Sequence, residues 1–299
     1  AGDGCLMEGI SHEAISIAGH MKLKNLIVFF DDNKISIDGS INLTCSDDQK
    51  KRFTASNWNT IEIDGHSFES IEKGIKNAIN SNKPTLISCK TTIGFGSPNK
   101  SGKETVHGSP LGGEEVKLTK KKLEWNYGNF EIPKIIRNKW KKIGINGRKK
   151  RLKWEEKLSK SKYQKDIKNQ FRNKVINRDN QTLTYLKNIL KTNKNEATRK
   201  SSQNSLEFFS NKINNFLGGS ADLTGSNLTK TKFSNISKKQ VNYIHYGIRE
   251  HLMAAAMNGI AVHKGFIPYG GTFLVFSDYC KNSIRLSAMM KKQVIYVLT

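Results

Sequence analysis

Two short polar segments in the first part of the chain have the residue types and the spacing of a metal-dependent phosphate site. Gly2-Asp3-Gly4 stands near the start, and Asn33 and Ile35 follow after an apolar stretch. Mg²⁺ prefers hard oxygen ligands in an octahedron, and a carboxylate, an amide oxygen and a backbone carbonyl are such ligands. The glycines let the backbone approach phosphate oxygens, and a following helix offers its first amides to negative charge. The pattern predicts a site for Mg²⁺ and a diphosphate.

Two other phosphate or metal motifs fit the same residues less well. Residues 31–39 are rich in acidic and amide side chains, as in an EF-hand loop, but the glycine is misplaced and the closing glutamate is absent. The glycine-rich turn at residues 2–4 does not have the GxGxxG spacing of a dinucleotide-binding turn. We therefore expect neither of these two motifs.

Strands and helices alternate around the first segment. Apolar residues recur at helical spacing over residues 6–20, and residues 25–30 are typical of a fully buried strand. Residues 60–63 and 84–90 predict two more strands, separated by a helix over residues 67–80 that Ser67 caps. A long Gly- and Ser-rich loop at residues 94–113 follows. This order predicts an α/β domain with a parallel sheet covered by helices on both faces.

The second half of the chain repeats the α/β pattern. We expect a strand running into a loop at residues 216–223, followed by a helix from residue 251. Residues 266–285 should hold a turn, an aromatic cluster and a helix, and residues 293–299 a strand. Residues 118–195 are dense in charge, which favours exposed helices joining two domains. The chain opens on a turn with no strand before it and closes on a strand, so we expect both domains to be incomplete.

Composition narrows the class of protein. The chain has 299 residues and a formal net charge of +24, which would normally suggest a nucleic acid or an acidic membrane as partner. The excess is mostly lysine and accompanies abundant Asn and Ile, so we favour compositional drift and expect no specific nucleic acid partner. Four scattered cysteines without a CxxC pair indicate neither disulfides nor zinc. Without a long apolar run or a signal pattern, we expect no membrane partner and a cytoplasmic location.

Eight blocks of the sequence, in order along the chain, resemble transketolases. They are residues 2–13, 31–39, 92–100, 107–112, 199–203, 218–223, 243–250 and 266–269. Only the basic region around residues 138–196 does not align with the family. The resemblance implies Mg²⁺ and thiamine diphosphate as cofactors. It assigns Asp3, Asn33 and the carbonyl of Ile35 to the metal and places Gly4 and Asn33 against the diphosphate.

The same resemblance assigns substrate and catalytic roles. His107 would contact both cofactor and substrate and act in catalysis. Arg199 and Ser226 would hold the phosphate of a sugar-phosphate substrate, since a guanidinium grips phosphate oxygens in pairs. Glu250 would bind the cofactor and share a proton with its aminopyrimidine ring, because burial keeps a carboxyl partly protonated. Standing alone, Arg199 and Ser226 would be ordinary surface groups, and Glu250 a helix-start carboxylate.

Two further assignments concern the aminopyrimidine and the partner subunit. Phe276 would stack on the aminopyrimidine with Phe273 and Tyr279 nearby, although aromatic residues at spacing three more often belong to a core. Glu8 would join an acidic network between the two active sites of a homodimer.

The resemblance implies transfer of a two-carbon ketol unit from a ketose phosphate to an aldose phosphate in the pentose phosphate pathway (EC 2.2.1.1). We expect a diphosphate-binding domain at residues 1–150, a basic helical linker at 151–195 and a pyrimidine-binding domain at 196–299. Because both domains are expected to be incomplete, we predict weak or no cofactor binding and no turnover by this chain alone. Two alternatives remain: a related enzyme such as a deoxyxylulose-phosphate synthase or a 2-oxo-acid dehydrogenase component, and a decayed basic protein that binds nucleic acid by charge.

Overall fold

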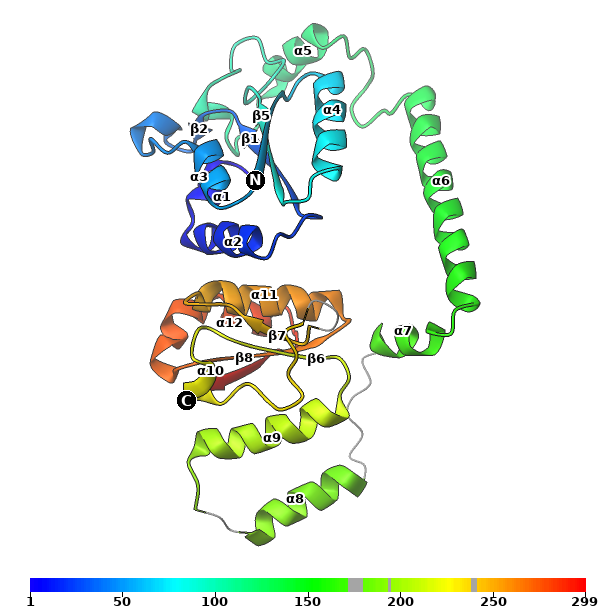
Figure 1. The fold of residues 1–299 in the computed structure, drawn as a ribbon. Helices are drawn as coiled ribbons and strands as arrows, with labels where there is room; N and C mark the ends of the chain where they lie inside the picture. The colour runs from blue at the N-terminus through cyan, green and yellow to red at the C-terminus, as the bar shows by residue number, and fades with distance from the viewer. Residues whose placement is uncertain (172–179, 193–194, 238–240) are drawn as a thin grey trace. The chain divides into compact units, whose positions relative to one another are not determined.

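The computed structural model describes residues 1–171, 180–192, 195–237 and 241–299 (Figure 1). These residues form two compact units, Ala1–Ile143 (unit 1) and Gly144–Thr299 (unit 2). Each unit contains a parallel sheet with helices packed against it, which confirms the predicted α/β class.

Unit 1 is built on a three-stranded parallel sheet. The strands, in spatial order, are β1 (Ile27–Asp32), β5 (Thr85–Lys90) and β4 (Asn59–Asp64). A small antiparallel pair, β2 (Ile35–Ser36) and β3 (Gly39–Ser40), follows β1. The prediction that the strand near residues 25–30 is fully buried was wrong, since Phe29 is 42% exposed. The physical reason is the position in the sheet: β5 is central and buried, whereas β1 is one of the two outer strands of this sheet.

Helices cover both faces of this sheet. On one face lie α1 (Asp3–Met7), α2 (Gly9–His20) and α3 (Gln49–Ala55), and on the other lies α4 (Phe68–Ile79) (Figure 1). Leu86 belongs to the core under α1 to α3, and its neighbour Ile87 belongs to the core under α4. Side chains alternate between faces along a strand, so one short apolar strand supplies both cores.

Local signals place two of these helices. The predicted cap of α4 is confirmed, because the Ser67 hydroxyl accepts a hydrogen bond from the Ser70 amide at 3.2 Å. The single helix expected over residues 6–20 was wrong, because it breaks at Glu8, whose backbone is extended. The Ser11 hydroxyl donates to the carbonyl of Cys5, and such a side-chain bond competes with the helical ladder.

The long loop predicted after β5 is confirmed, with one short 3₁₀ turn at Glu104–Val106. It ends at α5 (Gly113–Lys122). The next helix, α6 (Lys134–Ser159), begins in unit 1, crosses the division at residues 143 and 144, and buries no residue.

Unit 2 contains a four-stranded parallel sheet. The strands, in spatial order, are β7 (Tyr243–His245), β6 (Phe216–Ser220), β8 (Ile267–Thr272) and β9 (Ile295–Leu298). The helices are α7 (Gln164–Phe171), α8 (Asn180–Thr192), α9 (Thr198–Lys212), α10 (Thr224–Asn227), α11 (Glu250–His263) and α12 (Ser277–Met289). The expectation of a turn, an aromatic cluster and a helix over residues 266–285 missed a strand, because Ile267–Thr272 form β8. A Pro and two Gly made the strand hard to recognise from sequence.

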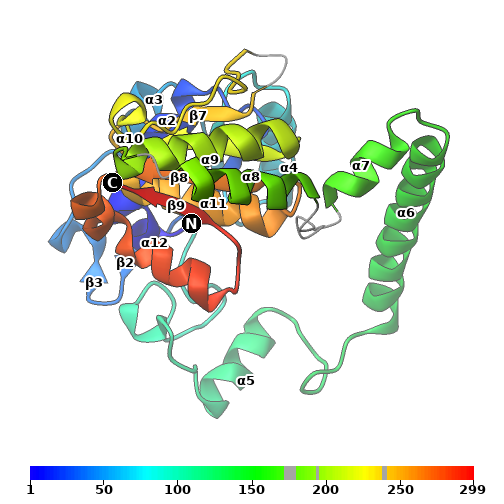
Figure 2. The same ribbon diagram turned by 90° about the horizontal axis from the view of Figure 1, so that it is seen from below.

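Two cores hold unit 2 together. Leu206 of α9 packs with Phe216, Tyr269 and Val297 of the sheet, and α8 stacks on α9 through Tyr185 and Phe208, whose ring centroids lie 4.1 Å apart (Figure 2). On the sheet's other side, α11 packs against β8 and α12. A side chain at Gly270 would meet the sulfur of Met257 at 2.7 Å, so α11 packs closely on a glycine.

The described part of the basic segment at residues 151–195 is mostly helical, in the end of α6 and in α7 and α8, with a turn between α6 and α7. Residues 172–179 and 193–194 of this segment lie outside the described residues. The expected domain boundaries at residues 150 and 195 stay predictions.

Candidate functional site

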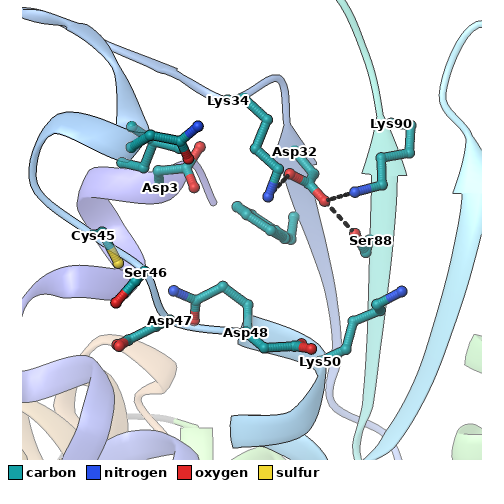
Figure 3. Close-up of a pocket in the computed structure, with 14 residues that line it drawn as sticks. Asp3, Asp32, Lys34, Cys45, Ser46, Asp47, Asp48, Lys50, Ser88 and Lys90 are labelled. Atoms are coloured by element: carbon teal, nitrogen blue, oxygen red, sulfur yellow. Dashed lines mark hydrogen bonds and ion pairs between the residues drawn. The ribbon is translucent and has the colours of Figure 1, made fainter.

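Asp3 is the first residue of α1 and lines a cavity of about 330 Å³ in unit 1 (Figure 3). Its side chain is only 7% exposed, yet its Oδ2 atom has no hydrogen-bond partner among the described residues. Burial raises the pKa of the Asp3 carboxyl, and the nearby Lys34 opposes that rise. A buried carboxylate oxygen without a partner is costly, and a bound cation would remove that cost.

A second carboxylate in the same cavity, that of Asp32, has charged and polar partners, although its buried Oδ1 atom makes no hydrogen bond among the described residues and only pairs with Lys34. Asp32, at the end of β1, accepts from the Ser88 hydroxyl at 2.9 Å and pairs with Lys90 at 2.5 Å and Lys34 at 2.9 Å (Figure 3). Burial alone would raise the pKa of Asp32, but these partners outweigh burial and hold that pKa below its usual value. Asp32 therefore stays ionised and anchors the lysines beside Asp3.

Asn33 and Ile35 follow β1, and Asn33 lines a different cavity. The Asn33 amide oxygen accepts from the Ile35 amide at 2.9 Å, and its nitrogen donates to Asp31 at 3.3 Å. Asn33 lines a cleft of about 520 Å³ together with Asp31 and Thr91. Residues 31 and 32 of β1 point to opposite faces of the sheet, and Asn33 continues on the face of Asp31. The structure brings Asp3 and Asn33 to one strand end but not into one cavity, so their shared metal stays a prediction.

Several observations test whether a metal and a diphosphate fit here. A side chain added at Gly2 or Gly4 would meet no heavy atom within 4 Å, so both glycines face open space. No group of three or more His, Cys, Asp or Glu that could hold a metal occurs among the described residues. The predicted ligand set does not need one, because it combines a carboxylate with an amide and a carbonyl. The partnerless oxygen of Asp3 and the open glycines fit the predicted group.

His107 lies on the long loop of unit 1 and is exposed. Its amide donates to the Glu104 carbonyl at 2.8 Å, which closes the 3₁₀ turn before it. No sequence pattern pointed to Glu115 of α5, whose carboxylate accepts two hydrogen bonds from Asn99, both at 2.9 Å, and one from Ser97. These bonds hold the pKa of Glu115 at about 2.

In unit 2 the predicted residues collect at one edge of the sheet. Ser226 lies in α10 directly after β6, Glu250 begins α11 after β7, and Phe276 lies in the 3₁₀ turn Leu274–Phe276 after β8. Because parallel strands end at the same edge, these three side chains belong to one side of unit 2. Arg199 is the second residue of α9, whose other end leads to the start of β6, and it is exposed.

Glu250 is 8% exposed, and its charge contributes to a raised pKa of the buried Cys280 thiol on α12, for which burial is the main cause. Phe273, Phe276 and Tyr279 form a row, with ring centroids 5.6 and 5.9 Å apart. The predicted aromatic group is thus contiguous, and Tyr279 is largely exposed.

A second group that the sequence did not reveal holds α10, the turn that carries Ser226. The buried Tyr243 hydroxyl lies 3.0 Å from the Thr224 hydroxyl and 2.8 Å from that of Thr229. Asn227 donates to the Thr272 carbonyl at 3.2 Å. These contacts join α10 to β7 and β8. The residues that make them are far apart in the sequence, so no local sequence pattern predicts the contacts.

Two remaining expectations concern surfaces. Glu8, assigned to a dimer network, is exposed at the break between α1 and α2. No described helix combines the length and the apolar character needed to cross a bilayer.

Comparisons with known proteins agree with this arrangement. Residues 1–181 match the family model "Transketolase, thiamine diphosphate binding domain", and residues 194–299 match "Transketolase, pyrimidine binding domain". The chain is 48% identical to a transketolase of Sinorhizobium medicae over 100% of this chain and 44% of that protein.

Solved structures give the same result. Transketolase from Leishmania mexicana superposes with a TM-score of 0.88 at 35% identity, over 100% of this chain and 46% of that one. Transketolase from Pichia stipitis in complex with sedoheptulose-7-phosphate superposes with a TM-score of 0.87 at 35% identity, over 99% and 46%. The chain spans less than half the length of these relatives. With a family model over more than half of its residues and both strand-end sites in the expected order, the chain belongs to the transketolase family.

Proposed function

We propose that this chain is the part of a transketolase that binds Mg²⁺ and thiamine diphosphate, in an enzyme that transfers a two-carbon ketol unit between sugar phosphates. The pentose phosphate pathway, a cytoplasmic location and a homodimer belong to the same proposal. One observation carries the cofactor assignment: the buried Oδ2 atom of Asp3 has no hydrogen-bond partner among the residues that the structure describes, and two glycines beside it face open space.

The residues of unit 1 would bind and orient. Asp3 would hold Mg²⁺ together with Asn33 and the carbonyl of Ile35, and Gly4 and Asn33 would lie against the diphosphate. The Asn33 amide oxygen already accepts a hydrogen bond from the Ile35 amide, which orients it. To bind the metal as well, this oxygen would have to direct its second lone pair toward the metal. When bound, thiamine diphosphate supplies a carbon nucleophile and an electron sink.

The residues of unit 2 would handle protons and phosphate. Glu250 is buried and would hold a proton at the aminopyrimidine, and Phe276 would stack on that ring. Arg199 and Ser226 are exposed and would bind the substrate phosphate, with His107 contributing to both cofactor and substrate. The sugar phosphate in the Pichia stipitis structure supports this substrate class.

The test measures thermal unfolding of this chain with and without Mg²⁺ and thiamine diphosphate, with Asp3→Ala as the variant. Ligand at ten times its dissociation constant stabilises a folded protein by about 1.4 kcal/mol. We expect stabilisation only at millimolar ligand in the unmodified chain and in the control Asp38→Ala, and none in Asp3→Ala. Stabilisation that persists in Asp3→Ala would contradict the role of Asp3, and tight saturable binding by calorimetry would contradict the expected weakness.

A further inference from the structure

The loop that carries His107 is fastened at its start by a single side chain. Ser97 and Asn99, just after β5, direct three hydrogen bonds onto the carboxylate of Glu115 in the first turn of α5. The Ser97 hydroxyl in turn accepts from the Lys100 amide at 3.1 Å. Each oxygen of the carboxylate accepts from the loop, so Glu115 joins two segments that are 16–18 residues apart in sequence.

Two further contacts close the loop around this anchor. The Lys100 ammonium donates to the carbonyl of Leu111 at 2.8 Å, which ties the start of the loop to its end. Gly96 adopts a φ of +89°, and a side chain there would approach Leu123 at the end of α5 within 2.8 Å. The start of the loop therefore packs along α5 from its first turn to its last.

The neighbouring glutamate shows that this arrangement is specific. Glu114 lies in the same helical turn but is exposed, and within the described part of the chain it pairs only with Lys117, at 2.7 Å on the same helix. Glu115 is 8% exposed and makes no ion pair among the described residues, its bonds going to a hydroxyl, an amide side chain and a backbone amide. Adjacent residues of one type thus serve different purposes, because only one faces the loop.

We propose that Glu115 is a positioning residue whose carboxylate fixes the loop that presents His107 at the strand end of unit 1. The proposal rests on the proposed function only for the role of His107. The loop contains glycines at positive φ, including Gly102 and Gly108, so its backbone has a large conformational entropy to lose. A carboxylate that accepts three bonds restrains it.

Charge matters to this restraint. The hydrogen bonds from Ser97 and Asn99, with a smaller effect of Lys100, lower the pKa of Glu115 to about 2 from a usual 4.5. The folded pKa is the lower one, so the restraint is complete above about pH 4.5 and is lost as the pH falls toward 2. Replacing the carboxylate by an amide puts a donor opposite the Asn99 donor and removes the charge.

Amide hydrogen exchange of this chain without cofactor tests the proposal. In Glu115→Gln we expect peptides spanning residues 97–111 to exchange roughly tenfold faster, while the matched control Glu114→Gln leaves them unchanged. Glu115→Asp should restore part of the protection. After correction for intrinsic rates, protection of these peptides should fall between pH 5 and 3 in the unmodified chain and stay flat in Glu115→Gln.

Unchanged loop protection in Glu115→Gln would overturn the proposal. If that variant loosens the whole of unit 1, Asn99→Ala, which removes one bond and leaves Glu115 in place, should still speed exchange in the loop while β4 and β5 stay protected. Equal exchange in Asn99→Ala and the unmodified chain would overturn the proposal as well. No cofactor is present, so failure of the proposed function does not change these outcomes.

Discussion

The two units hold their candidate residues by different chemistry. In unit 1, charged groups do so: Asp32 anchors Lys34 and Lys90 beside Asp3, and Glu115 anchors the loop of His107. In unit 2, neutral groups do so: hydroxyls and amides of Tyr243 and Asn227 hold the turn that carries Ser226.

This difference indicates which part of the molecule should depend on pH and on bound ions. The site that we propose for a metal and a diphosphate would need charge, and charged groups at its edge depend on pH and on bound ions. Burial raises the pKa of Tyr243, so its hydroxyl stays neutral at every physiological pH. The groups that support the candidate site of unit 1 should therefore respond to acid and cations, whereas those that hold the Ser226 turn of unit 2 should not.

The largest effect is expected for Asp32→Ala. Removing the carboxylate leaves Ser88, Lys34 and Lys90 without their shared acceptor, which should lower the free energy of unfolding of unit 1 by about 2 kcal/mol. The cost is below that of a fully buried pair because both lysines reach water. Urea unfolding followed by the fluorescence of Trp58, which is buried in unit 1, measures it. A loss no larger than that of Asp38→Ala would contradict the charged-anchor interpretation.

Tyr243→Phe tests the neutral anchor of unit 2. Loss of the hydroxyl bonds to Thr224 and Thr229 should cost about 1 kcal/mol, with the same value at pH 5 and pH 8. Exchange rates of the α10 amides report the loss. Tyr296→Phe is the matched control, because its hydroxyl contacts Ser287 on α12 and should leave α10 unaffected. Protection of α10 that is unchanged in Tyr243→Phe would refute the assignment.

The two units should lose their stability at different pH values when the solution is acidified. The folded pKa values of Asp32 and Glu115 lie below their usual 3.8 and 4.5, so their stabilisation is present above those values and is lost as the pH falls below them, toward about 2 for Glu115. Asp3 has a raised pKa and partly offsets this loss, because protonation favours its folded form. Exchange protection of β5 should fall at a higher pH than that of β6. Loss of exchange protection at the same pH in β5 and β6 would contradict the proposed difference between the two units.

The smallest effect is expected on the surface. Glu72 and Lys76 form an exposed ion pair one turn apart on α4, where water screens the attraction. Lys76→Ala should leave the urea midpoint of unit 1 unchanged within error, and added salt should not alter that result. A shift of the urea midpoint as large as that of Asp32→Ala would show that an exposed ion pair stabilises unit 1 as much as the buried carboxylate of Asp32 does.

Much of the fold followed from local patterns. The helix capped by Ser67, the strands near residues 60–63 and 84–90, and several elements of unit 2 appear where periodicity and turn residues indicated, whereas β8 was not predicted. The exposed face of β1 could not be predicted, because an apolar run does not reveal whether its strand is central or outer. The break at Glu8 depends on a bond between Ser11 and Cys5 that helical periodicity does not encode.

The sequence by itself determined the family and the order of its strand-end segments, since these depend on residue types at short spacing. Only the tertiary structure decided that Asp3 and Asn33 line different cavities and that Glu115 rather than Glu114 holds the His107 loop. The physical reason is that such contacts join residues far apart in the chain. The pleat of a strand and the packing of a helix determine which of two adjacent side chains faces the site.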